Sequence, residues 1–131
     1  MSGGILGIGV DLVENQRMKE VLGKWDSKFK SKVFRQGEQE YCDSQVAPFR
    51  HYAGRFAVKE AVSKAFGTGV GPQLSWLDIE VVRNAVSGAP YVELYGSGRQ
   101  LAKDRKVGQI LVSLAHTRDY AVAHTMILEQ I

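Results

Sequence analysis

The chain has 131 residues, of which 44% are hydrophobic and 24% are charged. This length leaves no room for a second core, and this composition is typical of folded proteins, so we expect residues 1–131 to form one domain. No apolar run approaches the ~20 residues needed to span a bilayer, and the amino terminus lacks the pattern of a signal peptide. We therefore expect a cytoplasmic protein.

The charge balance is mildly basic, with a net charge of +3 and a sequence pI of about 9.1. It favours an anionic partner, which could be a nucleic acid, a phosphate-rich ligand, an acidic protein or a membrane surface. A loose basic cluster at residues 24–35 is typical of a solvated helix face. Cys42 is the single cysteine, which excludes an internal disulfide and a thiolate zinc cluster.

Residues 5–13 predict a strand whose two faces differ in bulk. One face carries the large apolar side chains of Leu6, Ile8, Val10 and Leu12. The other face carries only Gly7, Gly9 and Asp11. Because glycine has no side chain, another backbone or a ligand could come close to this second face near Asp11.

Helical patterns follow. Asn15 is expected to cap a helix that runs to Trp25, with an apolar stripe at Met18, Val21, Leu22 and Trp25. Two shorter helical pieces are expected around residues 28–34 and 37–43. Pro48 opens the longest helix, from about Phe49 to Phe66, and Gly67 suits the left-handed position that ends it.

The second half of the chain predicts mostly strands. Residues 76–82 and 91–94 should form two strands joined by a turn at 88–90, followed by a short helix at 97–106. Two apolar strands, 110–116 and about 119–128, close the chain around a tight turn at Thr117-Arg118. This order implies an α+β domain with a mainly antiparallel sheet and helices packed on one side.

Three polar residues stand out as candidates for chemistry. Asp11 interrupts an apolar strand, so its carboxylate must be paired, bound to a metal or exposed at the strand end. Glu60 and Lys64 are spaced i, i+4 on one helix face, which is also typical of a surface ion pair. A neighbouring stripe of alanines at positions 57, 61 and 65 indicates instead that Glu60 lies at the edge of a cleft.

Further candidates are Arg55, Lys59, His116 and the glycine-rich loop 67–69. The loop follows a helix, whereas anion-binding loops precede one, so a flexible helix terminus is the simpler interpretation. His116 before the last turn and His124 in the last strand are more typical of structural histidines. Magnesium usually takes one or two carboxylates together with phosphates and water, so the residues alone suggest, as a hypothesis, a magnesium–phosphate site.

Three segments in order resemble the holo-acyl-carrier-protein synthase family, the short-chain branch of the phosphopantetheinyl transferases. Residues 7–14 (GIGVDLVE), followed by Arg17, are similar to its first motif. Residues 55–69 (RFAVKEAVSKAFGTG) are similar to its second and most specific motif. Residues 112–117 (VSLAHT), continuing through 120–123 (YAVA), are similar to its last motif.

The resemblance implies the 4′-phosphopantetheinyl transferase fold, with the long helix packed on the sheet. It implies transfer of 4′-phosphopantetheine from coenzyme A to a serine of apo acyl carrier protein, in fatty-acid biosynthesis, with 3′,5′-ADP as the second product. By position, Asp11 and Glu60 become the magnesium ligands and, with Lys64, the catalytic set. Lys64 also falls at a coenzyme-binding position, as do Arg55 and His116. The base for the attacking serine stays open: Glu60, a metal-bound water or another carboxylate could each serve.

The resemblance also implies partners. Arg17 and the first helix would hold the acidic carrier protein, and the chain would form a homotrimer with active sites in clefts between subunits. The segment 44–48 and Ala89 lack basic residues that some members use for the nucleotide, and Arg50 could substitute for the former. Two alternatives are a basic nucleic-acid-binding module and an inactive homologue. No RNP-type strand or recognition helix supports the first, so we expect no nucleic-acid partner. We also expect no membrane span.

Overall fold

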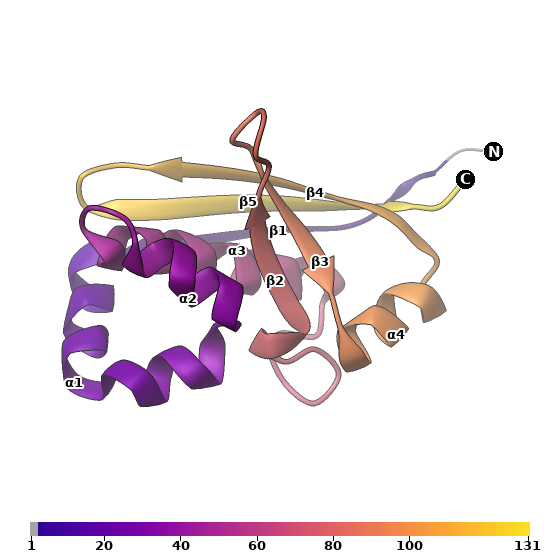
Figure 1. The fold of residues 1–131 in the computed structure, drawn as a ribbon. Helices are drawn as coiled ribbons and strands as arrows, with labels where there is room; N and C mark the ends of the chain where they lie inside the picture. Colours follow the sequence, from indigo (N-terminus) through magenta and orange to yellow (C-terminus); the bar gives the residue numbers. More distant parts are fainter. Residues whose placement is uncertain (1–2) are drawn as a thin grey trace.

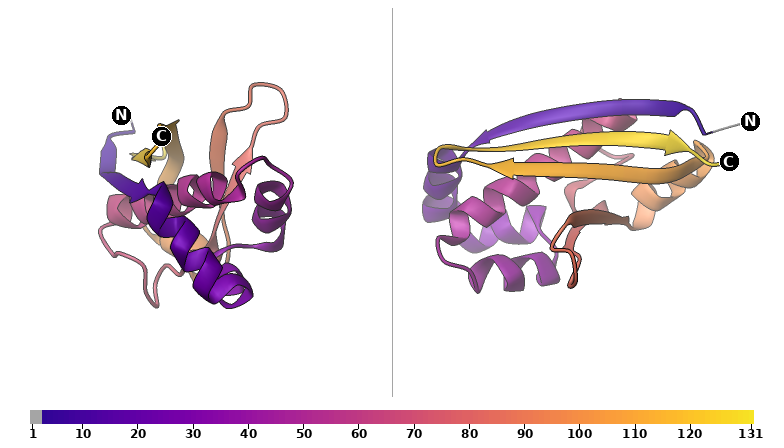
Figure 2. Two further views of the ribbon diagram at one scale, coloured as in Figure 1. Left: turned by 90° about the vertical axis from the view of Figure 1, so that its left-hand side faces the viewer. Right: turned by 90° about the horizontal axis from the view of Figure 1, so that it is seen from above.

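The computed structural model describes residues 3–131, which form a sheet layer and a helical layer. The sheet layer contains β1 (Ile5–Glu14), β5 (Tyr120–Glu129) and β4 (Val107–His116), antiparallel and in the order β1-β5-β4. The three long strands lie side by side above the helices (Figure 2, right). The expected α+β class, with an antiparallel sheet and helices on one side, is confirmed (Figure 1).

A separate hairpin pairs β2 (Ile79–Arg83) with β3 (Pro90–Leu94) and is followed by α4 (Gly96–Asp104). The strand expected to begin at residue 76 begins at Ile79, because Trp76–Asp78 form a turn of 3₁₀ helix. Within that turn the carboxylate of Asp78 accepts the backbone N–H of Ser75 at 3.0 Å. This local hydrogen bond competes with strand pairing and delays the start of β2.

The first helix, α1 (Asn15–Val33), is longer than expected and merges the two predicted pieces across a kink at Asp26, where φ is +35°. Asn15 does not cap it: the cap position is Glu14, and Asn15 is buried. Its Nδ2 donates instead to the carbonyls of Thr117 and Arg118 at 3.2 and 3.0 Å, which fastens the helix to the β4–β5 turn. Trp25 also departs from the predicted apolar stripe, since 52% of it is exposed.

The long helix α3 (Pro48–Phe66) agrees with its prediction, and Gly67 ends it in the left-handed conformation at φ +77°. Above it lies the sheet, and beside it lie α1 and α2 (Gln36–Asp43). Apolar residues on both sides of α3 are buried, so the helix is the centre of two core clusters. Within residues 3–131, no helix combines the length and apolar character that a membrane span requires.

Strand β1 approaches α3 very closely through its glycine face. A Cβ built on Gly7 would lie within van der Waals overlap of the Ala65 carbonyl oxygen, and one on Gly9 would overlap that of Ala61. The alanines themselves are almost fully buried. Small residues on both elements therefore let the two backbones touch, as the alternation of β1 indicated, and they bring Asp11 over the same helix.

We predict that Gly9→Ala destabilises the fold and Gly4→Ala does not. The added methyl at position 9 would collide with helix backbone, so strand and helix must separate, at a cost of about 1–3 kcal/mol or more. A Cβ at Gly4, also next to β1, meets nothing within 4 Å. Urea unfolding of the two variants checks this, and equal stability for both would contradict the close contact.

Candidate functional site

Asp11, Glu60 and Lys64 gather where β1 crosses α3. The ammonium of Lys64 donates to Oδ1 of Asp11 at 2.8 Å and to the carbonyl of Val10 at 3.1 Å. The Asp11 side chain is only 16% exposed, whereas that of Lys64 is 52% exposed. Glu60 and Lys64 thus do not simply form a surface ion pair with each other, because Lys64 binds Asp11 on β1.

Burial raises the pKa of Glu60, and the negative charge of Asp11 raises it further, while Lys64 acts in the opposite direction. Two carboxylates therefore repel each other at a half-buried position, with one ammonium as their counter-charge. An added cation, or a cation together with an anionic substrate, would relieve this repulsion.

The donor set fits magnesium. Hard carboxylate oxygens are the ligands that this ion prefers, and it commonly binds through one or two of them while substrate phosphates and water complete its shell. Asp11 and Glu60 supply such a pair. Among residues 3–131 no group of three or more His, Cys, Asp or Glu side chains is placed to hold a metal, so a closed cage built by this chain alone is not present there.

Arg55 and His116 belong to a second cluster, in a half-open cavity of about 240 Å³. Its walls come from α2, α3, the β2–β3 hairpin and the end of β4. Its polar side chains are those of Tyr41, His51, Arg55, Arg83 and His116. All of these can donate hydrogen bonds, and no carboxylate is among the described residues that line the cavity, so it is suited to an anion.

Arg55 is the most buried basic group of this cavity, with 7% exposed. Its guanidinium stacks over the ring of Tyr41 at 4.2 Å, and its Nε has no hydrogen-bond partner within residues 3–131. A buried charge without a partner is costly. This buried N–H group is therefore suited to a negative ligand, and the stacked tyrosine restricts the orientation of the guanidinium.

The two histidines of the cavity lie with ring centroids 6.2 Å apart. Burial lowers the pKa of His116, and Arg55 and Arg50 lower it further. Burial also lowers the pKa of His51, and His116 and Arg55 add to that effect. The His116 ring packs against Gly54, where an added Cβ would lie 2.7 Å from Cε1, so glycine at this position keeps room for the imidazole.

The two clusters lie on different sides of α3. Arg55 and Lys64 are nine residues apart, which corresponds to about two and a half helical turns and about 14 Å along the axis. The predicted residues therefore form two groups within one chain: Asp11, Glu60 and Lys64 in one, and Arg55 and His116 in the other. Arg17 is exposed in the first turn of α1.

Two other candidates from the sequence, Lys59 and the loop 67–69, make contacts that stabilise the fold. Lys59 is fully buried and forms an ion pair with Glu38 at 2.8 Å. The loop after α3 folds back on the helix end, where the backbone N–H of Gly69 donates to the Ser63 carbonyl at 3.2 Å. The simpler interpretation of that loop, a helix terminus, agrees with this geometry.

Tyr41, His51 and Arg83 were not singled out from the sequence. Arg83 ends β2, opposite Pro90 of β3, and an arginine at a strand end has no local feature that marks a site. His51 does carry a signal, because it lies one helical turn before Arg55 and so shares its face. Tyr41 comes from another helix, which only the tertiary fold brings near.

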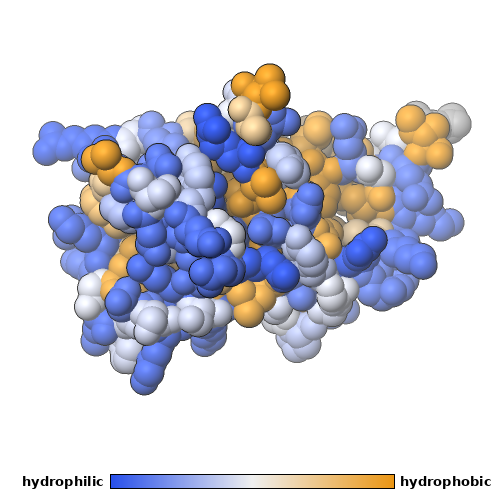
Figure 3. All heavy atoms as spheres, in the orientation of Figure 1, coloured by the Kyte–Doolittle hydropathy of each residue, from blue (hydrophilic) through white to orange (hydrophobic). Residues whose placement is uncertain are grey.

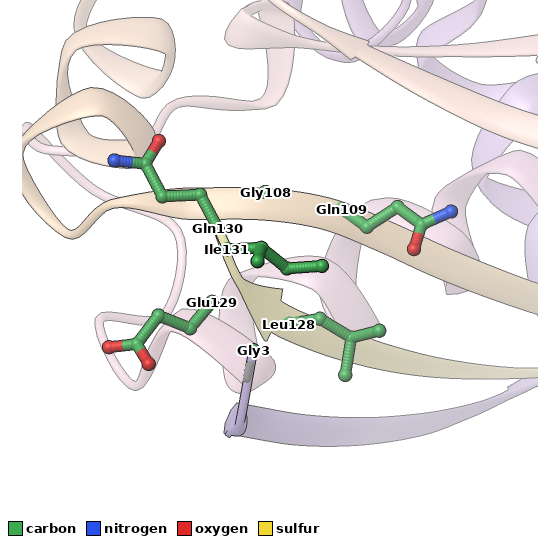
Figure 4. Close-up of a pocket in the computed structure, with 7 residues that line it drawn as sticks. All are labelled: Gly3, Gly108, Gln109, Leu128, Glu129, Gln130 and Ile131. Atoms are coloured by element: carbon green, nitrogen blue, oxygen red, sulfur yellow. The ribbon is translucent and has the colours of Figure 1, made fainter. Parts of the chain in front are cut away.

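A further hollow is lined by residues of β4 and β5 and by Gly3, Gln130 and Ile131, which lie beyond the strand ends (Figure 4). Glu129 is the charged side chain among the described residues that line it. A hollow with a carboxylate and no described basic group does not suit a phosphate ligand, so this hollow is not the candidate site.

The chain matches the family model described as "4'-phosphopantetheinyl transferase superfamily" over residues 7–125. Among curated proteins, the holo-[acyl-carrier-protein] synthase of Ruminiclostridium cellulolyticum is 43% identical over 121 residues, which cover 92% of this chain and 90% of the relative. The protein of the same name from Syntrophus aciditrophicus is 43% identical and covers 94% of each chain.

Solved structures agree. The holo-[acyl-carrier-protein] synthase of Neisseria meningitidis matches with a TM-score of 0.88 at 25% identity, over 95% of this chain and 98% of that one. The Helicobacter pylori enzyme of the same name, solved in complex with coenzyme A, matches with a TM-score of 0.81 at 28% identity, over 92% and 98% of the two chains.

Proposed function

Because this chain belongs to the 4′-phosphopantetheinyl transferase superfamily, we propose that it transfers 4′-phosphopantetheine from coenzyme A to a serine of apo acyl carrier protein, in fatty-acid biosynthesis. The observation that carries this proposal is the cluster of Asp11, Glu60 and Lys64 where β1 meets α3. Two carboxylates and an ammonium are the groups that a magnesium-dependent transfer of a phosphoryl-type group needs. We take residues 1–131 as one catalytic domain.

The reaction breaks the pyrophosphate linkage of coenzyme A. The serine oxygen of the carrier forms a bond to the phosphorus attached to pantetheine as its proton passes to a base, and 3′,5′-ADP leaves with the bridging oxygen. Asp11 and Glu60 would hold Mg²⁺, which when bound supplies Lewis-acid stabilisation of the charge on the phosphate oxygens. Lys64 adds a second positive charge, and its partly exposed ammonium can donate to a phosphate while it stays near Asp11.

We predict that Asp11→Ala and Glu60→Ala each reduce transfer at least about a hundredfold, because each removes one carboxylate of the metal-binding pair. Apo acyl carrier protein is incubated with coenzyme A and the enzyme, with magnesium or with EDTA, and its intact mass is measured. The wild-type protein should add one phosphopantetheine in magnesium and none in EDTA.

Asp104→Ala is the matched control, since this carboxylate is exposed on α4 and should not affect transfer. Full activity of either site variant at ordinary magnesium concentration would overturn the assignment of the metal ligands. Absence of any mass gain by the wild-type protein, despite bound coenzyme A, would favour the inactive homologue over the transferase.

The exposed apolar residues on the outer face of the sheet support the proposal that the chain forms a homotrimer. On this face the exposed fractions of Ile8, Val10 and Leu12 of β1 are 60%, 55% and 60%. Leu111 of β4, on the same sheet, is 43% exposed. Monomeric proteins rarely leave such a contiguous apolar surface in water, so another copy of the chain is the natural cover. The two clusters on different sides of α3 support sites between subunits, since a neighbour could bring its own Arg55 and His116 to Asp11 and Glu60.

We predict that two defective variants complement each other in mixed trimers. Asp11→Ala and His116→Ala proteins, each inactive at low coenzyme A concentration, should regain activity when refolded together. If every site takes one cluster from each of two neighbours, about a quarter of the sites in a random mixture are intact. A mixture no more active than the mean of the pure variants would mean that each site lies within one chain.

The helical face offers a surface for the acidic carrier protein. Hydrophilic residues cover most of the face that carries α1 and α2 (Figure 3). Along α1, the basic residues Arg17 and Lys24 are exposed at helical spacing, and Lys28 is exposed beyond the kink at Asp26. A row of exposed cations favours docking of an anionic helix or loop and makes the encounter sensitive to salt.

We predict that Arg17→Ala raises the KM for the carrier protein several-fold and leaves kcat and the KM for coenzyme A nearly unchanged. The contact is exposed and electrostatic, so it acts on docking rather than on the transition state. Steady-state kinetics against carrier concentration measures this, with Arg99→Ala on α4 as the control. A change confined to kcat would contradict a docking role.

The proposal also assigns the protein to the cytoplasm. Its thiol is unpaired and buried, and burial raises the pKa of Cys42 to about 12, so the group is an unreactive part of the core. An unpaired cysteine is compatible with a reducing compartment.

A further inference from the structure

A histidine interrupts the apolar outer face of the sheet. His124 is the fifth of the ten residues of β5, and β5 is the central strand, so the residue lies at the middle of this face. The register pairs it with Val10 of β1 on one side and with Ser113 of β4 on the other. The structure leaves His124 exposed, so its side chain is not part of the core.

No charged side chain faces His124 from the strands on either side of it. The residues opposite and diagonal to it are Ile8, Val10, Leu12, Leu111, Ser113 and Ala115, and the next residues of β5 on this face are likewise apolar. The nearest titratable groups on the face are Glu14 and Tyr120, four residues or about 13 Å away along β5. Asp11 of β1 points to the opposite face, where it binds Lys64 of α3.

A second copy of the chain that covers this face would remove His124 from water. An imidazolium buried among apolar groups loses its hydration and gains no counter-charge from its own chain, which is costly, whereas a neutral imidazole avoids this penalty. In a symmetric trimer the penalty arises three times. Histidine is also the side chain that ordinarily changes its charge between pH 5 and pH 8. This step rests on the homotrimer of the proposed function.

We propose that His124 makes the assembly of this chain depend on pH, because its neutral form allows the outer face of the sheet to be buried and its protonated form opposes burial. The direction follows from proton linkage. Separate chains bind more protons than the trimer does, so association strengthens as the pH rises through the range in which histidine titrates and weakens as the pH falls. Sites formed between subunits would be lost with the trimer at low pH.

The test measures the oligomeric state on either side of the ordinary pKa of a histidine side chain. Analytical ultracentrifugation at about pH 7.5 and about pH 5.5 gives the protein concentration at which half of the chains are trimeric. For the wild-type protein this concentration should rise about tenfold or more at the lower pH. Circular dichroism at both pH values checks that the chain stays folded.

Three variants isolate the imidazole. His124→Gln is neutral throughout, so its half-trimer concentration should agree within about twofold at the two pH values. His124→Lys carries a permanent charge and should be mainly monomeric at both. His51→Gln is the matched control: His51 lies on α3 and not on the outer face of the sheet, so this variant should respond to pH as the wild-type protein does.

An unchanged or tighter wild-type trimer at the lower pH would overturn the inference. So would a His124→Gln protein that remains as sensitive to pH as the wild type. A wild-type protein that is monomeric at both pH values would instead refute the homotrimer of the proposed function, while the mass assay of the carrier protein tests the transfer reaction separately.

Discussion

A buried ion pair joins three of the elements that line the cavity around Arg55. Lys59 of α3 lies 2.8 Å from Glu38 of α2, and both side chains are fully buried. The lysine also donates to the Ile79 carbonyl at 2.6 Å, and the glutamate accepts the backbone N–H of Val81 at 2.8 Å. Helix α3, helix α2 and strand β2 are thereby held by one hydrogen-bonded group of atoms.

Such a pair adds little stability compared with apolar residues of the same shape, but loss of one partner costs about 3–5 kcal/mol, because the other charge stays buried alone. Its value here is positional. Tyr41 lies one turn after Glu38 on α2, and Arg55 one turn before Lys59 on α3, so the pair fixes the stacked groups beside it. Arg83 lies two residues after Val81 on β2, so the same hydrogen bond also helps to position Arg83.

The sequence predicted those features that depend on neighbours in the chain. The glycine face of β1, the extent of α3 and its end at Gly67 follow from short-range patterns, and residues 7–17 and 55–69 carried the family resemblance. Long-range contacts were beyond such patterns. The carbonyl partners of Asn15 lie more than 100 residues away, so its local resemblance to a cap was misleading. Lys59 looked like a candidate for chemistry because its partner Glu38 is on a separate helix.

Helix α3 is buried on nearly all sides, with twelve of its nineteen residues removed from solvent. One side of α3 packs in the core under the sheet, and the other side packs in the core that α1 and α2 share with it. Neither layer keeps an intact core if this helix leaves it. The molecule should therefore unfold as one cooperative unit, without a stable half-folded form, and the two chemical clusters should be lost together.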